Sequence, residues 1–235
     1  MSYYSYDNGG RGGLLAGMPA AVKNIIFINV IVMLMTSLKE NFMYETFALF
    51  YPTSPFFHWW QPVTHMFMHG GFFHVLINMY MLYMFGSVVE NVIGTKKFLV
   101  FYFICGFGAA ALHTGVEYMQ LQSYMEGAAL GNQMSLRQIS LMKVTPTVGA
   151  SGAIYGILIA YAMLFPQSRM TLLFPPITLS AKSMTLLFIG IELLTGLSGS
   201  GGNIAHFAHL GGALFGFLLI KYWRSRGTLF DKYRF

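Results

Sequence analysis

The sequence predicts an all-α membrane protein with six transmembrane helices and both termini in the cytoplasm. Hydrophobic residues make up 55% of its 235 residues and charged residues only 9%, whereas soluble domains usually carry about 25% charged residues. Several apolar stretches approach the ~20 residues that an α-helix needs to cross a hydrocarbon core of ~30 Å. They do not alternate in polarity over ~10-residue segments, as transmembrane β-strands do, so a helical bundle is expected.

The first expected span, residues 20–38, follows a flexible tail over residues 1–20. This run ends without a cleavage site of the A-x-A type, so it is expected to be a retained helix and not a signal peptide. The remaining spans are expected at about residues 72–92, 97–116, 148–165, 183–197 and 203–222. Together they form a membrane core over residues 21–222, and a basic tail over residues 223–235 follows.

Three of the expected connections have a distinctive composition. Residues 39–72 are rich in aromatic residues and prolines, and rings with a polar edge favour the membrane interface, so this segment is expected to lie partly there. Residues 117–147 are more polar and are expected to form a water-exposed loop that can contain some helix. Residues 196–202, a Gly/Ser stretch, are expected to form a flexible cap.

The distribution of charge predicts the orientation. The net charge is +6, and the basic residues gather at the ends of apolar runs, which is typical of orientation signals and argues against nucleic-acid binding. With six spans and cytoplasmic termini, only Lys39, Arg137 and Lys143 among the basic residues would lie outside. The protein is expected to be a multi-pass integral membrane protein, and its expected location is a bacterial inner membrane. Cys105 is the only cysteine, which excludes an intrachain disulfide.

A glycine-framed serine opens the fourth expected span. Ser151 stands between Gly149 and Gly152. A serine in a membrane helix is most often a small packing residue, and its hydroxyl is a weak nucleophile until a neighbouring base takes its proton. His209 enters the sixth expected span from the same side and at a similar depth, so it is the expected base.

Glycines around both residues allow the two helices to approach each other. Gly152 and Gly156 are four residues apart, and Gly212 and Gly216 have the same spacing. Such small-xxx-small faces permit close contact between helix backbones, which would bring the hydroxyl and the imidazole within ~2.6–3.2 Å. Tyr155 shares a helical face with the serine and is expected to pack its ring on the imidazole.

No carboxylate lies near either motif in the sequence. We therefore expect a Ser–His dyad whose base is oriented by packing and not by an acid. Glu192, inside the fifth expected span, is the one acid that could contradict this, and a structural or gating role is expected for it. His206 lies one turn before His209 and is a competing base, but the glycine spacing is counted from His209 and favours it.

Histidines gather at the start of the second expected span. His74 and Asn78 share a helical face, and His65 and His69 could do the same. Attack on a carbonyl makes an oxyanion, and one preorganised donor contributes roughly 3–4 kcal/mol, so His74, Asn78 and the backbone N–H of Ser151 are the expected donors. The alternative is a metal site, because H-x-x-x-H is ligand spacing. No Glu or Asp lies between His65 and His74, however, and no metal is expected.

Taken together, these motifs resemble those of the rhomboid family of intramembrane serine proteases. The resemblance rests on G-x-S-G at residues 149–152, the tyrosine four residues after the serine, Ala208-His209 with Gly212 and Gly216, and H-x-x-x-N at residues 74–78. It extends from about Trp60 to Gly216. Glu90 is similar to the acid that ends the family's second helix. Many bacterial relatives have Trp-Arg in the first loop, whereas Trp60 is followed here by Gln61.

The resemblance implies a six-helix core with Ser151 as nucleophile, His209 as general base, and an oxyanion site from His74, Asn78 and the Ser151 N–H. It implies hydrolysis of a peptide bond in or near the membrane-spanning segment of single-span proteins, without a cofactor. The expected partners are these substrates and the lipid bilayer, and no nucleic acid. Two alternatives remain: a catalytically inactive rhomboid-like binder of membrane proteins, and a histidine-lined metal transporter, which the scarcity of carboxylates in the spans disfavours.

Overall fold

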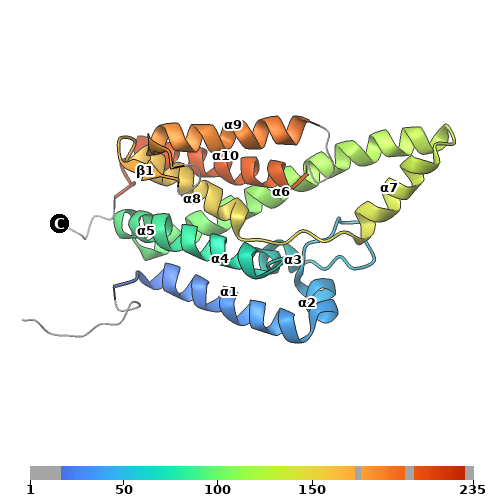
Figure 1. Cartoon of the computed structure of the whole chain (residues 1–235), viewed down its shortest axis with the longest axis horizontal. Helices are drawn as coiled ribbons and strands as arrows, with labels where there is room; N and C mark the ends of the chain where they lie inside the picture. Colours follow the sequence, from blue (N-terminus) through green and yellow to red (C-terminus); the bar gives the residue numbers. More distant parts are fainter. Residues whose placement is uncertain (1–16, 173–175, 199–203, 231–235) are drawn as a thin grey trace, which may run out of the picture.

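The chain folds into a bundle of helices that run roughly along one axis (Figure 1). A computed structural model describes residues 17–172, 176–198 and 204–230. The described part is mostly helical, with one short pair of strands, so the predicted all-α class is confirmed in its main feature.

The first helix, α1 (Ala20–Leu38), covers the first predicted span. A carboxylate from elsewhere in the chain holds its N-terminus. Glu90 is only 1% exposed and accepts hydrogen bonds from the backbone N–H groups of Ala21, at 2.9 Å, and Val22, at 2.8 Å. Such N–H groups have no partner within a helix, and negative charge there suits the helix dipole. The hydroxyl of Thr95 donates to the same carboxylate at 2.8 Å.

The aromatic connection contains three short helices, α2 (Glu40–Phe47), α3 (Gln61–Thr64) and the 3-10 helix η1 (His65–Phe67). Gln61 is fully buried and holds this loop together. Its amide donates to the backbone oxygens of Phe56, at 2.8 Å, and Glu45, at 3.3 Å. Its oxygen accepts from the backbone N–H of Phe50 at 3.4 Å. The residue that departs from the Trp-Arg pattern is therefore itself the anchor of the first loop.

The second predicted span is one continuous apolar helix made of α4 (Phe72–Met81), the π-helix η2 (Leu82–Gly86) and α5 (Ser87–Ile93). After it, α6 (Thr95–Ala129) runs for 35 residues, which corresponds to about 52 Å at 1.5 Å per residue. This exceeds a hydrocarbon core of ~30 Å. The helix therefore extends well beyond the predicted third span, and α7 (Gln133–Val144) folds back from its far end (Figure 1).

The predicted loop over residues 117–147 is mostly helical, so the interpretation as a loop was largely wrong. Residues 117–129 continue α6 and residues 133–144 form α7. Asn132 caps α7, because its side-chain oxygen accepts from the backbone N–H groups of Met134, at 2.9 Å, and Ser135, at 3.4 Å. The rise in polarity after residue 116 marks a helix that no longer needs an apolar surface, and it does not mark the end of that helix.

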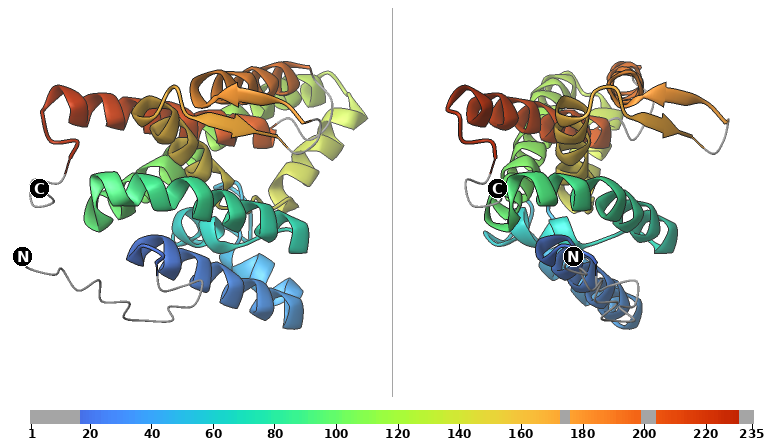
Figure 2. Two further views of the ribbon diagram at one scale, coloured as in Figure 1. Left: turned by 60° about the vertical axis from the view of Figure 1, so that its left-hand side comes forward. Right: turned by 90° about the vertical axis from the view of Figure 1, so that its left-hand side faces the viewer.

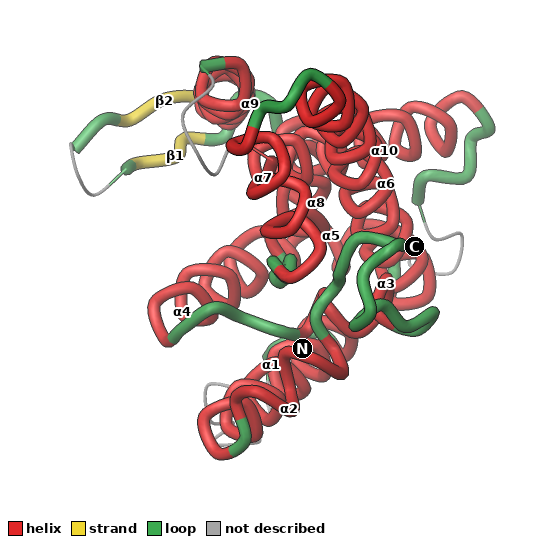
Figure 3. The backbone as a smooth tube through the Cα atoms, turned by 90° about the vertical axis from the view of Figure 1, so that its right-hand side faces the viewer, coloured by secondary structure: helices red, strands yellow, loops and turns green. Residues whose placement is uncertain are grey.

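The last three helices are α8 (Ser151–Leu164), α9 (Ala181–Leu197) and α10 (Ile204–Ser225). Between α8 and α9, the antiparallel strands β1 (Arg169–Thr171) and β2 (Thr178–Ser180) project from one side of the bundle (Figure 2). An end-on view places α9 at the edge of the bundle, beside α8 and α10 and opposite α1 (Figure 3). Of the predicted cap over residues 196–202, the part from residue 199 onward lies outside the described residues.

Three helices of the described part are long and apolar enough to span a membrane: Ala20–Leu38, Phe72–Ile93 and Thr95–Ala129. They correspond to the first three predicted spans. Since α8 has 14 residues and α9 has 17, the full set of six spans stays a prediction. Helix α1 begins and α10 ends at the same end of the bundle (Figure 1), as an even number of antiparallel helices requires. The cytoplasmic location of that end also stays a prediction.

Helices α8 and α10 are in backbone contact at the predicted glycines. A Cβ atom built on Gly212 would lie 1.8 Å from the carbonyl oxygen of Gly152, and one built on Gly216 would lie 2.7 Å from the Cα of Gly156. A Cβ on Gly156 would also lie 2.4 Å from the Sγ of Cys105, on α6. The predicted small-xxx-small faces therefore pack against each other, and α6 closes the other side of the contact.

Candidate active site

Ser151 is the first residue of α8. The chain reaches it through Gly149, whose φ of +135° is a conformation that residues with a side chain rarely adopt. The N–H of Gly149 donates to the backbone oxygen of His65 at 3.0 Å, which fixes the approach of the chain. Because the first N–H groups of a helix have no acceptor within it, the helix leaves the N–H of Ser151 available to another acceptor.

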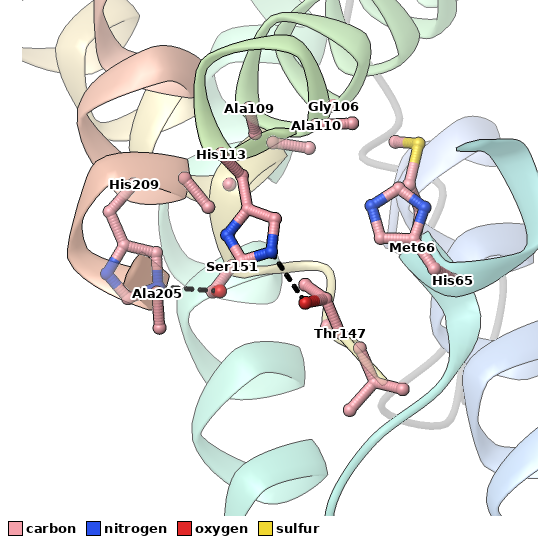
Figure 4. A pocket seen from close by; sticks show the side chains of 15 residues that line it. His65, Met66, Gly106, Ala109, Ala110, His113, Thr147, Ser151, Ala205 and His209 are labelled. Atoms are coloured by element: carbon pink, nitrogen blue, oxygen red, sulfur yellow. Dashed lines mark hydrogen bonds between the residues drawn. The ribbon is translucent and has the colours of Figure 1, made fainter. Parts of the chain in front are cut away.

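His209, on α10, reaches the serine hydroxyl. Its Nε2 lies 2.7 Å from the Oγ of Ser151 (Figure 4), which is the distance expected between a general base and a nucleophile. The ring of Tyr155 stacks on the imidazole, with centroids 4.4 Å apart and planes at 6°. The structure thus brings together the predicted pair, and Tyr155 packs on the imidazole as the spacing predicts.

A carboxylate also contacts the imidazole, contrary to the prediction of a base held by packing alone. The Oε1 of Glu192, on α9, lies 2.9 Å from the Nδ1 of His209. The hydroxyl of Tyr155 donates to the same oxygen. Sequence reasoning missed this contact because the acid lies on a different helix from the base, so no helical spacing connects the two. The usable signal was a single acid inside an otherwise apolar span.

His206, the competing base, lies on the other side of that carboxylate. Its Nδ1 is 2.5 Å from the Oε2 of Glu192. The hydrogen bond to the serine hydroxyl is made by His209. The geometry therefore favours His209 as the base, as the glycine spacing predicts.

His74 and Asn78 lie one turn apart on α4, as predicted. The Nδ1 of His74 accepts a hydrogen bond from the N–H of Gly70 at 3.2 Å, so the proton of a neutral ring lies on Nε2. A Cβ built on Gly149 would lie 3.2 Å from that Nε2 and 3.5 Å from the Oγ of Ser151, so both groups flank the same glycine. Asn78 is buried and donates to the backbone oxygen of His74 at 2.8 Å, which uses one of its two amide hydrogens.

His65 and His69 do not share a helical face. His65 lies in η1, where its Nδ1 donates to the backbone oxygen of Gln61 at 2.9 Å, whereas His69 lies in the loop that follows. Both rings are buried, and burial lowers the pKa of each to about 4. Both rings are therefore neutral near pH 7.

The residues best placed to hold a metal ion are not those that the sequence suggested. Within the described ranges, the group that meets the spatial requirement is Glu192, His206 and His209, whose ligand atoms all lie within 4.8 Å of one another. These same atoms are joined by hydrogen bonds between the carboxylate and the two imidazoles. The three side chains therefore already hydrogen-bond one another through the atoms that would bind an ion.

A small cavity lies beside the serine hydroxyl. Its volume is about 40 Å³, whereas one water needs roughly 10–15 Å³. The hydroxyl of Thr147 lies 2.7 Å from the Nε2 of His113 in its wall. Sequence reasoning did not single out His113, whose only signal is a polar residue in an apolar helix. The side chains that line the cavity include His65, His113, Thr147, Ser151 and His209 (Figure 4).

The described part of the chain thus contains helices long and apolar enough to span a membrane, and a serine hydroxyl hydrogen-bonded to an imidazole lies within their bundle, which together indicate an integral membrane protein with a buried Ser–His pair. The family model of the rhomboid domain matches residues 57–226. This range covers both members of the pair as well as His74, Asn78 and Glu192. The chain belongs to the rhomboid family.

Several curated proteins are similar to the chain. The presenilin-associated rhomboid-like protein, mitochondrial, of Bos taurus is 30% identical over 169 residues, which cover 69% of this chain and 39% of that protein. The protein of the same name from Homo sapiens is 31% identical over the same coverage. Rhomboid protease AarA of Providencia stuartii is 28% identical over 163 residues, 68% of this chain and 54% of AarA. The match thus spans less than two thirds of each relative.

Proposed function

We propose that this chain is an intramembrane serine endopeptidase, which hydrolyses peptide bonds in or near the transmembrane segments of other membrane proteins. The observation that carries the proposal is the 2.7 Å hydrogen bond between the Oγ of Ser151 and the Nε2 of His209. The relative AarA, which is named as a protease, supports the same activity. Because apolar helices surround the pair, a substrate would have to be a segment that enters the bilayer.

In the proposed reaction, the Oγ of Ser151 attacks the carbonyl carbon of the scissile bond while its proton passes to the Nε2 of His209. The carbonyl oxygen becomes an oxyanion. The N–H of Ser151, the Nε2–H of His74 and the free amide hydrogen of Asn78 would donate to it. His209 then returns the proton to the leaving amine, and the carbonyl carbon stays bonded to the serine as an acyl-enzyme.

Water completes the proposed reaction. The cavity of about 40 Å³ beside the serine has room for a water molecule and is lined by polar groups from His113 and Thr147. His209 would take a proton from this water, which attacks the acyl carbon, and would return the proton to the Oγ of Ser151. The reaction as written needs no cofactor or metal.

The proposed substrates are single-span membrane proteins whose helices unwind near small residues, because an extended backbone must reach the serine. The mitochondrial names of several relatives do not fit the bacterial inner membrane expected from the sequence, whereas AarA comes from a bacterium. The proposal therefore concerns a site inside a bilayer and is independent of which membrane this is.

The alternative function is that of an inactive member of the family, which binds membrane proteins without cutting them. The rhomboid-like names of some relatives state no protease activity. The intact hydrogen bond between hydroxyl and imidazole favours the enzyme, because a binding protein has no need for it.

The test is cleavage of a single-span substrate by the purified protein in liposomes. We expect cleavage by the wild type, and its loss in Ser151→Ala and in His209→Ala, because one lacks the nucleophile and the other lacks the base. A fluorophosphonate probe, which reports an activated serine without any substrate, should label the wild type and not Ser151→Ala.

Two controls make this test decisive. Ser140→Ala removes a serine hydroxyl that donates to the backbone oxygen of Leu136 within the same helix, at 3.1 Å, and the variant is expected to cleave like the wild type. Binding of the substrate without cleavage, together with no probe labelling of the wild type, would support the inactive member of the family instead.

A further inference from the structure

Glu192 makes contacts that a packing residue does not need. Glu192 is 8% exposed, and its carboxylate accepts hydrogen bonds from three side chains. Oε1 accepts from the Nδ1 of His209 at 2.9 Å and from the hydroxyl of Tyr155, and Oε2 accepts from the Nδ1 of His206 at 2.5 Å. A charge within a membrane helix is costly and is usually paired. Here two of the three partners belong to the stacked pair beside the serine.

The carboxylate determines which nitrogen of His209 carries the proton. A neutral imidazole has one N–H and one lone pair, and an ionised carboxylate only accepts. The proton is therefore on Nδ1, where it faces Glu192, and the lone pair is on Nε2, where it faces the Oγ of Ser151 at 2.7 Å. This is the tautomer that can take a proton from the hydroxyl. Stacking on Tyr155 orients the plane of the ring but does not distinguish its two nitrogens.

The carboxylate is also placed to stabilise the charge that forms on the base. When His209 takes the serine proton it becomes a cation, and Glu192 lies 2.9 Å from its Nδ1. Opposite charges attract more strongly in a protein interior than in water. Because Tyr155 and His206 hold both carboxylate oxygens beforehand, the acid does not have to reorganise when the charge appears.

We propose that Glu192 is a positioning residue that completes a Ser–His–Glu triad, with Tyr155 and His206 holding its carboxylate. The serine comes from α8, the acid from α9 and the base from α10. During attack the proton moves from the Oγ of Ser151 to the Nε2 of His209, the Nδ1 proton stays in place, and Glu192 stays ionised. This inference rests on the proposed function and deepens it.

The central test compares Glu192→Gln with Glu192→Asp in the cleavage assay. The glutamine amide can donate where the carboxylate accepts, which favours the wrong tautomer of His209. We expect kcat to fall by a factor on the order of 10²–10⁴, with KM changed by less than about threefold. Glu192→Asp keeps a carboxylate and should recover at least about tenfold of the lost kcat.

A matched variant separates this effect from a disturbance of α9. Thr185 lies on the same helix and is 3% exposed, so Thr185→Val alters a buried polar group away from the serine and is expected to keep the wild-type kcat. Thermal unfolding of each variant in detergent shows that it is folded. A folded Glu192→Gln variant that keeps more than about half of the wild-type kcat would overturn the proposal.

A spectroscopic readout keeps this proposal separate from the proposed function. In protein labelled with ¹⁵N-histidine and carrying Ser151→Ala, the His209 ring should show the Nδ1–H tautomer, with its signals assigned by their loss in His209→Ala. Adding Glu192→Gln should shift the tautomer equilibrium of the His209 ring toward the Nε2–H form. If the Ser151→Ala protein shows the Nδ1–H signature but the wild type cuts nothing, the proposed function alone is refuted. Cleavage without the signature would refute the triad alone.

Discussion

Asn78 is the residue through which the proposed oxyanion site is tested most directly, because its amide has one hydrogen in use and one to spare. Asn78→Ala removes the spare donor. If one donor contributes roughly 3–4 kcal/mol, kcat should fall on the order of 10²–10³-fold with little change in KM, as measured in the cleavage assay.

The matched control is Asn132→Ala, which removes an amide that caps α7 away from the serine. It should lower stability by about 0.5–2 kcal/mol and leave kcat in place. A kcat for Asn78→Ala within about threefold of the wild type would remove Asn78 from the oxyanion site.

The stability of the protein should depend on pH through the buried ring of His65. Burial lowers its pKa from 6.5 to about 4, so between these values the unfolded chain binds a proton that the folded chain does not. The contribution of the neutral His65 ring to the free energy of unfolding is therefore complete above pH 6.5 and is lost as the pH falls toward 4. At about 1.4 kcal/mol per pKa unit, the loss is on the order of 3 kcal/mol. Tm should fall steeply with acid over this range.

The variant that tests this is His65→Asn, whose amide can still donate to the backbone oxygen of Gln61 but does not titrate. Its Tm should fall less steeply than that of the wild type between pH 6.5 and pH 4.5. Parallel curves for the two proteins would show that the acid sensitivity comes from other groups.

Residue by residue, the sequence was most informative where chemistry and spacing coincide. Ser151, His209 and Tyr155 follow from motifs with glycines at helical intervals, and the structure brings all three together. Glu192 acts through His209, which lies on another helix, and Gln61 contacts the backbone of Glu45 in α2. Contacts of this kind depend on how whole helices pack, which the spacing within one helix does not encode.

Among the elements, α1 depends on a contact from another helix. The carboxylate of Glu90 accepts hydrogen bonds from the backbone N–H groups of Ala21 and Val22, in the first turn of α1, and from the hydroxyl of Thr95. Glu90→Gln keeps the shape but replaces one acceptor oxygen by a donor and removes the charge. We expect a loss of about 1–3 kcal/mol of stability, seen as a lower Tm.

Glu126→Gln is the matched exchange on an exposed part of α6 and should leave Tm nearly unchanged. Equal Tm values for the two variants would show that the α1 contact contributes little to stability. Probe labelling of Glu90→Gln below its own Tm should resemble the wild type, because Glu90 does not contact the serine or its base.

The limits of helices were predicted well only where polarity changed with them. Helix α1 matches its predicted span, and α4 through α5 ends one residue beyond its own. For α6 the polar residues after residue 116 were interpreted as a loop, although the helix continues to Ala129. Hydropathy reports where a helix leaves the bilayer, whereas local backbone and capping signals report its limits: Gly131, just beyond α6, has a φ of +82°, and the Asn132 side chain caps the start of α7.

At the scale of the molecule, the contact between α8 and α10 should control both stability and activity. A Cβ on Gly212 would lie 1.8 Å from a backbone oxygen of the facing helix, and backbone cannot yield as a side chain does. Gly212→Ala should therefore separate the two helices, destabilise the fold by about 1–3 kcal/mol or more, and abolish fluorophosphonate labelling of Ser151.

The matched control is Gly190→Ala on α9, where an added Cβ meets nothing within 4 Å. In a helix interior this exchange should stabilise by about 0.5–1 kcal/mol and preserve labelling. A Gly212→Ala protein that labels like the wild type would show that the hydroxyl and the imidazole do not depend on this crossing.

The three side chains of the proposed triad come from three successive helices, and their order along the chain has a temporal consequence. Ser151 is synthesised first, Glu192 follows, and His209 arrives on α10, the last of the three. Until α10 is inserted and packed, the serine has no base and its hydroxyl is inert. In the proposed mechanism, a chain whose α10 has not yet been inserted therefore lacks an activated serine, and packing of α10 against α8 completes the proposed site.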